Sequence, residues 1–473
     1  MYINGNWESS QEKFTVYNPA NGEAIGEVSN GSREYATKAI SAAATALPGW
    51  SSTTAYERSE RLYSAHRLMM ERRPQLAELM TREQGKPLKA SMNEVKYAAD
   101  FLLWFAEEAK RIYGETIPSA RADQRFLVHK QAVGVVAAVT PWNYPISMLT
   151  RKLAPALAAG CTVVLKPAEA TPLCAIAVFE ILDAVGFPPG VVNLVTAEAP
   201  QAIGEEFCTN PLVRKLTFTG STAVGKKLAQ DAAPQLKRVS MELGGHAPFI
   251  VYADADPVHA AQGVSLVKFL NAGQACISPN RIFVQRGILE LFLETLRGRI
   301  EKMRAGDGMD PANGIGPLVN EAAIAKVDRQ VQDAVGSGAI LHVGGRRLTE
   351  NGLDRGHFYA PTLLSGIRSD MQIFREETFG PVAAVIAFDE DDDVIAMAND
   401  TNYGLAAYVY TQNLARAMRT FEALNFGIIG INDINPTSAA APFGGMKESG
   451  LGREGAREGI EEYLETKLGG FSI

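Results

Sequence analysis

Cysteine is scarce in this chain. Four cysteines occur in 473 residues, at positions 161, 174, 208 and 276, and no two of them form a C-x-x-C pair. In a chain of this size they form no framework that could staple the fold, so we expect four reduced thiols. The histidines are also scattered without the spacing of metal ligands, which argues against a zinc site; they are His66, His129, His246, His259, His342 and His357.

An excess of positive charge is absent as well. The formal net charge is -7 and the pI is about 5.6. Binding to nucleic acid requires a basic face, so we expect a small-molecule partner and no nucleic acid.

Long apolar runs are missing too. None approaches the roughly 18 residues that span a bilayer, and the start, Met-Tyr-Ile-Asn-Gly-Asn-Trp, carries neither a basic leader nor an apolar signal core. We therefore expect a cytoplasmic protein without a membrane partner.

The hydrophobic pattern changes along the chain. Residues 33–113 show helical periodicity, with one long helical stretch from Tyr56 to Gln84 that stops at Gly85. Short apolar runs then alternate with helical segments, which predicts parallel strands covered by helices on both faces. The runs are Gly134–Thr140, Thr162–Lys166, Val191–Val195, Arg214–Thr219, Pro248–Tyr252, Arg281–Gln285, Ala339–Val343, Val382–Phe388, Ala406–Tyr410 and Gly427–Ile431.

Three further segments complete the prediction. Residues 122–133 and the end of the chain after Gly459 alternate apolar and polar residues like exposed strands, and we interpret them as a subunit-pairing arm. The paired glycines Gly244 and Gly245 permit a tight reversal and mark a boundary between two lobes. The acidic run 389–393 is interpreted as a solvated helix start, where carboxylates suit the helix dipole.

Cys276 is the one cysteine set among small and turn-forming residues, in Asn271-Ala-Gly-Gln-Ala-Cys276-Ile-Ser-Pro-Asn280. A reactive thiol fits there, although a lone cysteine is more often a small buried hydrophobe. Glu242 ends an apolar strand beside the paired glycines and could act as a general base once burial raises its pKa, or be a surface charge. Asn143 ends another strand in a rigid turn, where its amide could stabilise an oxyanion or serve only the turn.

Two strand ends could hold a nucleotide. The segment Thr217-Phe-Thr-Gly220-Ser-Thr-Ala-Val-Gly225 reads as a strand, a glycine turn and a helix start, which can bind a pyrophosphate through backbone N–H groups. Its middle position is Thr222 rather than glycine, so it is not the G-x-G-x-x-G fingerprint. Lys166 and Glu169 close a second strand with a cation and a carboxylate suited to ribose hydroxyls.

Together these features resemble the aldehyde dehydrogenase superfamily, in the same order and across nearly the whole chain. Cys276 lies 34 residues after Glu242, the family's spacing of base and nucleophile. The segments Glu376-Glu377-Thr-Phe379-Gly-Pro and Pro442-Phe-Gly-Gly445 also match family motifs. The resemblance implies an α/β fold with two Rossmann-like lobes and a small β oligomerisation arm. It divides the chain into an NAD(P)-binding domain (1–120 and 137–244), a catalytic domain (245–440) and the arm (121–136 and 455–473).

The resemblance also implies roles. Cys276 would attack the aldehyde as thiolate, with the oxyanion held by the Asn143 side chain and the Cys276 backbone N–H. Hydride would pass to the nicotinamide, and Glu242 would activate the water that hydrolyses the thioester. Lys152 would lie near the nicotinamide, and the cofactor contacts would be Thr140, Trp142, Lys166, Glu169, Gly220, Ser221, Gly225, Leu243, Gly244, Glu377 and Phe379. A carboxylate at Glu169 favours NAD, with NADP possible.

Within the superfamily the chain most resembles succinate-semialdehyde dehydrogenases, through Met148–Val164, Met241–Pro248 and Ala440–Gly455. Arg151 and Ser438 fall where that subfamily grips the distal carboxylate of its substrate. A second arginine often precedes the nucleophile by six residues there, but here the position is Leu270. Ser278 replaces a second cysteine, so no disulfide gate is expected.

We therefore expect an NAD(P)-dependent dehydrogenase of a semialdehyde such as succinic semialdehyde, working as a homodimer or homotetramer without a metal. The alternative is broader activity on neutral aliphatic or aromatic aldehydes. A coenzyme-A-acylating enzyme is disfavoured by Glu242 at the position of the base. A non-catalytic use of the fold is disfavoured by the complete set of Cys276, Glu242 and Asn143.

Overall fold

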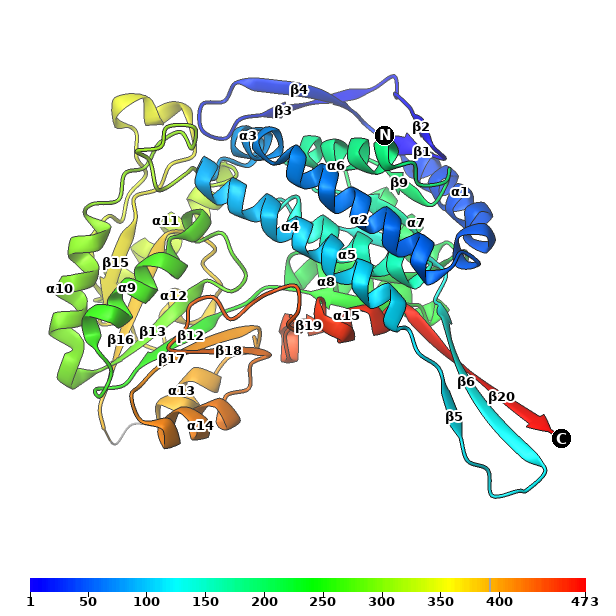
Figure 1. Cartoon of the computed structure of the whole chain (residues 1–473). Helices are drawn as coiled ribbons and strands as arrows, with labels where there is room; N and C mark the ends of the chain where they lie inside the picture. Colours follow the sequence, from blue (N-terminus) through cyan, green and yellow to red (C-terminus); the bar gives the residue numbers. More distant parts are fainter. Residues whose placement is uncertain (391–392) are drawn as a thin grey trace.

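The computed structural model describes residues 1–390 and 393–473, and within them two α/β lobes stand side by side (Figure 1). The first lobe contains an eight-stranded sheet in the order β19-β11-β10-β7-β8-β9-β1-β2. Its five inner strands from β11 to β9 are parallel, as the alternating pattern predicted. The strands are β1 (Tyr2–Ile3), β2 (Asn6–Trp7), β7 (Val135–Val139), β8 (Thr162–Lys166), β9 (Val192–Leu194), β10 (Val213–Thr219), β11 (Arg238–Glu242) and β19 (Gly450–Leu451).

Helices cover the first lobe, and the N-terminal helical layer is confirmed. The N-terminal layer consists of α1 (Arg33–Ser51), α2 (Ala55–Glu71), α3 (Arg73–Gln84) and α4 (Leu88–Glu108). The other helices of this lobe are α5 (Ser147–Ala159), α6 (Pro172–Val185), α7 (Gln201–Thr209), α8 (Thr222–Ala232) and α15 (Ala456–Glu461). The single helical stretch expected from Tyr56 to Gln84 is wrong, because the chain breaks at Arg72 into α2 and α3. Pro74 explains the break, since proline is favoured in the first turn of a helix and Pro74 lies in the first turn of α3.

The second lobe contains a seven-stranded sheet in the order β14-β15-β16-β13-β12-β17-β18, parallel except for β14. Its strands are β12 (Ala247–Val251), β13 (Pro279–Gln285), β14 (Ile340–Val343), β15 (Thr362–Ser365), β16 (Val382–Phe388), β17 (Ala406–Tyr410) and β18 (Ile428–Ile431). Its helices are α9 (Pro257–Lys268), α10 (Leu289–Ile300), α11 (Glu321–Gly336), α12 (Gln372–Arg375), α13 (Val394–Asn399) and α14 (Leu414–Ala423). The predicted fold class, α/β with two Rossmann-like lobes, is confirmed.

Two small sheets lie outside the lobes. One is a hairpin of β3 (Lys13–Tyr17) and β4 (Ala24–Ser29). The other, in the order β20-β6-β5, joins β20 (Leu464–Ser472) to β6 (Gln124–Ala132) and β5 (Glu115–Ile117). It projects from the body as an arm (Figure 1). The two exposed strands expected from the sequence pair with each other in this sheet, as β6 and β20. The domain boundaries remain predictions.

Two details concern the ends of elements. Asp393 accepts a hydrogen bond from the Ala396 N–H and caps α13, consistent with the helix start expected from the acidic run 389–393. Residues 391–392 of that run lie outside the described residues. No helix in the described part of the chain combines the length and apolarity that a bilayer crossing requires.

Gly85 ends α3 at a tight contact. Its φ is +92°, a left-handed conformation that side chains rarely adopt, and a Cβ there would lie 2.5 Å from Pro317 Cγ. We predict that Gly85→Ala lowers stability by about 2 kcal/mol or more, because it adds backbone strain and overpacking. The thermal midpoint should fall by several degrees, while Gly287→Ala, where a Cβ meets nothing within 4 Å, should leave it unchanged. Equal midpoints for both variants would contradict the prediction.

Candidate active site

A cavity of about 240 Å³ lies where the two lobes meet. Residues at or just beyond the carboxyl ends of β7, β10 and β11 form one wall, and the Cys276 loop and the Glu377–Phe379 segment form another. Ligands bind at this edge of parallel sheets because several strand ends converge there. The lining consists of Pro141, Trp142, Asn143, Met148, Thr219, Gly220, Ser221, Glu242, Leu243, Gly244, Cys276, Ala323, Lys326, Glu377, Thr378 and Phe379.

Cys276 is the partly exposed cysteine of the four, and the other three are buried. It follows three consecutive residues with left-handed backbone, Asn271, Ala272 and Gly273, the first two of which are strained because they carry a Cβ. Burial, then the nearby Glu242 carboxylate, raises the pKa of the Cys276 thiol to about 12. The thiol is therefore protonated at neutral pH until a positive charge or a base acts on it.

Asn143 lies directly across from this loop. Its side-chain Nδ2 donates to the Gln274 carbonyl at 3.1 Å, and its own carbonyl accepts from Asn271 Nδ2 at 3.0 Å. The side chain is buried and its residue lines the cavity beside Cys276. The amide is thus held beside Cys276 by a hydrogen bond to the loop that carries it.

Glu242 ends β11 and is 4% exposed. Neither carboxylate oxygen has a hydrogen-bond partner among the described residues. Burial, then the nearby Glu454 carboxylate, raises the pKa of Glu242 well above its ordinary value. A buried carboxylate without structural hydrogen bonds is poorly suited to a structural role and well suited to moving a proton.

Lys152 and Arg151 lie behind the cavity and do not line it. Lys152 Nζ donates to Glu454 Oε1 at 2.6 Å and to Thr217 Oγ1 at 3.1 Å. Arg151 Nε is 2.9 Å from Glu454 Oε2, and the guanidinium stacks 3.9 Å from the centre of the Phe443 ring. Burial opposes ionisation of Glu454, but the two cations together lower its pKa. Arg151 Nη2 is buried without a partner among the described residues.

The glycine-rich turn after β10 meets the start of α8. Ser221 caps this helix, and Gly220 and Ser221 line the cavity. Gly225 lies one turn further along and does not reach the cavity; a Cβ there would be 2.3 Å from Leu243 Cδ2, so it allows α8 to pack closely on Leu243. The helix N-terminus therefore faces the cavity and suits a phosphate.

Gly244 and Gly245 carry the chain from β11 into the second lobe. Neither has left-handed backbone, so the expected tight reversal is not the reason for glycine here. A Cβ at Gly245 would lie 2.2 Å from the Cys276 carbonyl oxygen, and one at Gly244 would lie 2.9 Å from Glu377 Oε2. Close approach of the segment after Glu242 to the Cys276 loop is the physical reason.

Lys166 and Glu169 sit outside the cavity lining, at the end of β8. They form an ion pair of 3.3 Å, with Lys166 buried and Glu169 half exposed. Thr140 is buried on the neighbouring strand end, where its N–H donates to the Lys166 carbonyl. The three form one group that can meet the adenosine end of a nucleotide whose other end enters the cavity.

Glu377 and Phe379, from the second lobe, line the same cavity as Gly220 and Ser221. Glu377 Oε1 accepts from the Gly245 N–H at 2.9 Å, and burial raises the pKa of its carboxyl group. Phe379 has φ of +55° and meets Trp142 edge to face, with ring centroids 5.6 Å apart. The two aromatic rings could pack against a ligand ring, and the Glu377 carboxylate could accept hydrogen bonds from ribose hydroxyls.

Leu270 and Ser438, predicted substrate contacts, are both exposed and neither lines the cavity. Several site residues were not predicted at all. Glu454 stood in a motif quoted for the resemblance without being assigned a role, and Lys326, Thr378, Lys86 and Glu94 carried no local signal. Only the fold brings these residues to the cavity wall or behind it.

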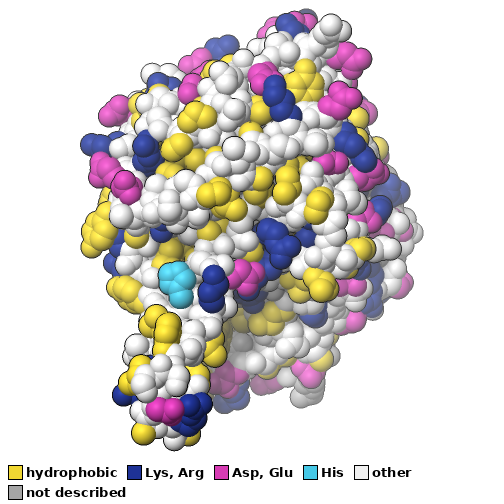
Figure 2. Space-filling model, turned by 90° about the vertical axis from the view of Figure 1, so that its right-hand side faces the viewer, with side chains coloured by type: hydrophobic (Ala, Val, Ile, Leu, Met, Phe, Trp, Pro, Cys, Tyr) yellow, Lys and Arg dark blue, Asp and Glu magenta, His cyan; other side chains and the backbone are white. Residues whose placement is uncertain are grey.

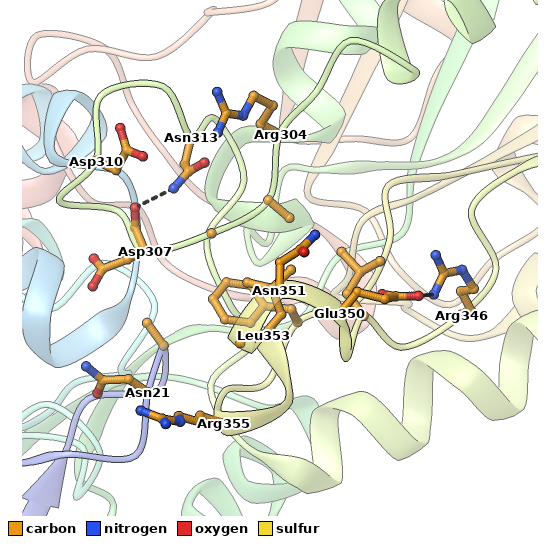
Figure 3. A pocket seen from close by; sticks show the side chains of 16 residues that line it. Asn21, Arg304, Asp307, Asp310, Asn313, Arg346, Glu350, Asn351, Leu353 and Arg355 are labelled. Atoms are coloured by element: carbon orange, nitrogen blue, oxygen red, sulfur yellow. Dashed lines mark hydrogen bonds and ion pairs between the residues drawn. The ribbon is translucent and has the colours of Figure 1, made fainter.

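A second hollow, of about 780 Å³, shares no lining residue with the Cys276 cavity (Figure 3). Its polar side chains bond among themselves: Asn313 Nδ2 donates to the Asp307 carbonyl at 3.1 Å, and Arg346 pairs with Glu350 at 2.5 Å. It contains no cysteine or histidine. Nowhere among the described residues do three or more metal-binding side chains gather.

Comparison with known proteins shows the family of this chain. A model of the aldehyde dehydrogenase family matches residues 7–468. Succinate-semialdehyde dehydrogenase [NADP(+)] of Escherichia coli is 50% identical, covering 98% of this chain and 96% of that protein. Glutarate-semialdehyde dehydrogenase of Pseudomonas putida is 48% identical, covering 98% and 96%. A crystal structure of an E. coli NADP-dependent enzyme matches with a TM-score of 0.97 at 49% identity, covering 100% and 98%. The chain belongs to the aldehyde dehydrogenase family and is an NAD(P)-dependent oxidoreductase.

Proposed function

We propose that the protein oxidises a semialdehyde with a terminal carboxylate to the dicarboxylate, through a covalent thioester on Cys276. The reaction consumes the aldehyde, NAD(P)⁺ and water, and yields the acid, NAD(P)H and a proton. The observation that carries the proposal is the cavity itself, where a partly exposed cysteine meets an amide donor and an unbonded carboxylate. Names of relatives that act on succinate or glutarate semialdehyde support the substrate class.

Each site residue has one step in this proposal. The Cys276 thiol loses its proton to solvent, the thiolate sulfur bonds to the aldehyde carbon, and the Asn143 amide stabilises the oxygen that becomes negative. NAD(P)⁺, when bound, accepts the hydride that leaves this carbon. Glu242 then takes a proton from water, which attacks the thioester and releases Cys276. Lys152 and Glu454 form a buried ion pair behind the cavity that contains Cys276 and Glu242.

The cofactor would be held at three places. The residues that fit it are Gly220 and Ser221 at the start of α8 for the pyrophosphate, the Lys166–Glu169 pair for the adenosine ribose, and Glu377 with Phe379 for the nicotinamide end. We propose a preference for NAD, because the half-exposed Glu169 carboxylate accepts from a 2′-hydroxyl and repels a 2′-phosphate. NADP appears in the name of the E. coli relative, so activity with NADP is to be measured beside activity with NAD. The cytoplasmic location expected from the sequence stays a prediction.

Glu242→Gln should separate the two halves of the reaction. Loss of a general base typically costs about 10²–10⁴ in rate, so steady-state turnover should fall by that factor. The first turnover needs no water, so one equivalent of NAD(P)H per active site should still form in a stopped-flow burst. Because the raised pKa of Glu242 means that its basic form populates only as pH rises, wild-type kcat should increase toward alkaline pH. Cys276→Ala should show no burst, and a Glu242→Gln variant with normal turnover would contradict the assignment.

Arg151 lies behind the cavity lining, paired with Glu454, but its Nη2 has no hydrogen-bond partner among the described residues, and we propose that a substrate reaching past the lining bonds it through the distal carboxylate. A charge-assisted hydrogen bond is worth about 1.5–3 kcal/mol. We therefore predict that Arg151→Gln lowers kcat/KM for succinic semialdehyde roughly tenfold to a hundredfold more than for butanal, which has the same carbon count and no carboxylate. Initial rates with NAD and NADP measure both the substrate and the cofactor preference.

Leu270 offers the reciprocal variant. Its side chain is 43% exposed, so an arginine is tolerated there, and Leu270→Arg should raise the ratio of kcat/KM for the semialdehyde to that for butanal. Equal effects on both substrates in the Arg151→Gln and Leu270→Arg variants would favour the alternative of broad activity on neutral aldehydes.

We also propose that the arm joins subunits in a homodimer or homotetramer. It stands away from the body with apolar side chains exposed among charged ones (Figure 2). Leu127 and Phe471 lie on the same face of paired strands and are 46% and 52% exposed. Exposed apolar edges of this kind normally pair with another chain.

The arm prediction can be tested by sedimentation velocity. The double variant Leu127→Glu with Phe471→Glu should shift the protein to a smaller species, because it places two charges in the buried contact. Tyr56→Glu, at a site 74% exposed on α2 and outside the three-stranded arm sheet, is the matched control and should keep the wild-type assembly. An unchanged assembly in the arm variant would contradict the proposal.

A further inference from the structure

A second buried ion pair lies beside the active site, between Lys86 and Glu94, and it belongs to neither the nucleophile nor the base. Both side chains are 1% exposed, and Lys86 Nζ contacts Glu94 Oε2 directly. Taking two charges out of water costs several kcal/mol, which their attraction only roughly repays, so such a pair is weak evidence for stability. What else the two groups bond indicates what the pair is for.

Lys86 bonds the loop that carries the oxyanion donor. Its residue follows Gly85, where α3 ends. Nζ donates to the Asn143 carbonyl at 2.7 Å and lies 4.0 Å from the centre of the Tyr144 ring. The cation therefore holds Asn143 by its backbone, while the Asn143 side chain points to Gln274 in the nucleophile loop.

Glu94 bonds the other end of the same loop. It stands on α4, and its Oε1 accepts from the backbone N–H groups of Ile146 at 3.0 Å and Ser147 at 3.2 Å. These residues begin α5, which has no cap from the side chain of its own N-cap residue. The carboxylate of Glu94 takes the place of that cap and suits the positive end of the helix.

The pair thus bonds the 143–147 loop at both ends. One oxygen of Glu94 bonds the start of α5, its other oxygen bonds Lys86, and Lys86 bonds the Asn143 carbonyl. A second donor, Asn271 Nδ2, reaches the same Asn143 carbonyl from the nucleophile loop. The position of the Asn143 amide relative to Cys276 therefore depends on charges that lie outside the cavity.

We propose that Lys86 and Glu94 are positioning residues, which place the Asn143 amide for the oxyanion formed at Cys276. The inference rests on the proposed function, because it takes Asn143 as the oxyanion donor. A misplacement of about 1 Å in a reacting group can cost about a hundredfold in rate. Neutralising the pair should therefore slow the chemical step without weakening the binding of the cofactor.

The test uses Lys86→Met with Glu94→Gln in one full-length chain. This double variant removes both charges together, so no isolated charge stays buried. We expect the burst rate of NAD(P)H formation to fall roughly tenfold to a hundredfold, with an unchanged Kd for NAD(P)H by fluorescence titration. Should the double variant fail to fold, Lys86→Arg keeps the two buried charges paired while it displaces the donor to the Asn143 carbonyl, and it should show a smaller slowing of the same step.

Arg58→Met is the matched control. Arg58 is also a buried cation on a helix of the first lobe, and its Nε donates to the Ala158 carbonyl at 2.9 Å, at the other end of α5. We expect this variant to lower the thermal midpoint while its burst rate stays within about threefold of wild type. An equal slowing in the Arg58→Met variant would show that any damage to α5 has this effect and would overturn the inference.

Asn143→Ala completes a double-mutant cycle. If the ion pair acts through Asn143, neutralising the pair should change the burst rate by less than about threefold in the Asn143→Ala chain. The same large slowing in both backgrounds would overturn the positioning role while leaving the proposed function intact. An Asn143→Ala chain with a wild-type burst rate would instead remove Asn143 as oxyanion donor, and the inference would fall with that part of the proposed function.

Discussion

The backbone contact between Gly245 and Cys276 is the constraint on which the site depends. A Cβ at Gly245 would lie 2.2 Å from the Cys276 carbonyl oxygen, so only glycine allows the two segments to touch. Glu242 lies three residues earlier on the same chain, at the end of β11. The strand that carries the carboxylate and the loop that carries the thiol therefore meet through backbone rather than through adaptable side chains. Such contacts hold reacting groups with the accuracy that catalysis requires.

Charge is distributed unevenly behind this contact. Glu454 is paired with both Lys152 and Arg151, and its pKa is lowered, whereas Glu242 has no hydrogen-bond partner among the described residues and its pKa is raised. The surroundings of these two nearby carboxyl groups thus shift their pKa values in opposite directions. Glu454 holds the two cations, whereas both oxygens of Glu242 lack hydrogen bonds to the described residues. Environments that push the pKa values of neighbouring groups apart are typical of acid and base assignments in enzymes.

Much of the fold was predictable because the inner strands are buried on both faces. Continuous apolar runs such as Thr162–Lys166 and Val382–Phe388 match β8 and β16 residue for residue. The hairpin β3–β4 and the two-residue strands β1 and β2 were not predicted, since short strands on a surface leave little hydrophobic pattern. The break between α2 and α3 was also missed, although Pro74 marks it, because the helical periodicity continues on both sides.

By itself, the sequence determined the family, the candidate nucleophile Cys276, the candidate base Glu242 and the candidate oxyanion donor Asn143, because each stands in a local motif with its own backbone requirements. Tertiary structure alone decided how their charges are set. Glu454 lies 302 residues from its partner Lys152, and Lys86 lies 57 residues from the Asn143 carbonyl that it bonds. No local pattern encodes such pairings. Burial is a property of the folded core, and it is burial that makes an ordinary lysine or glutamate hold a catalytic group or shift its pKa.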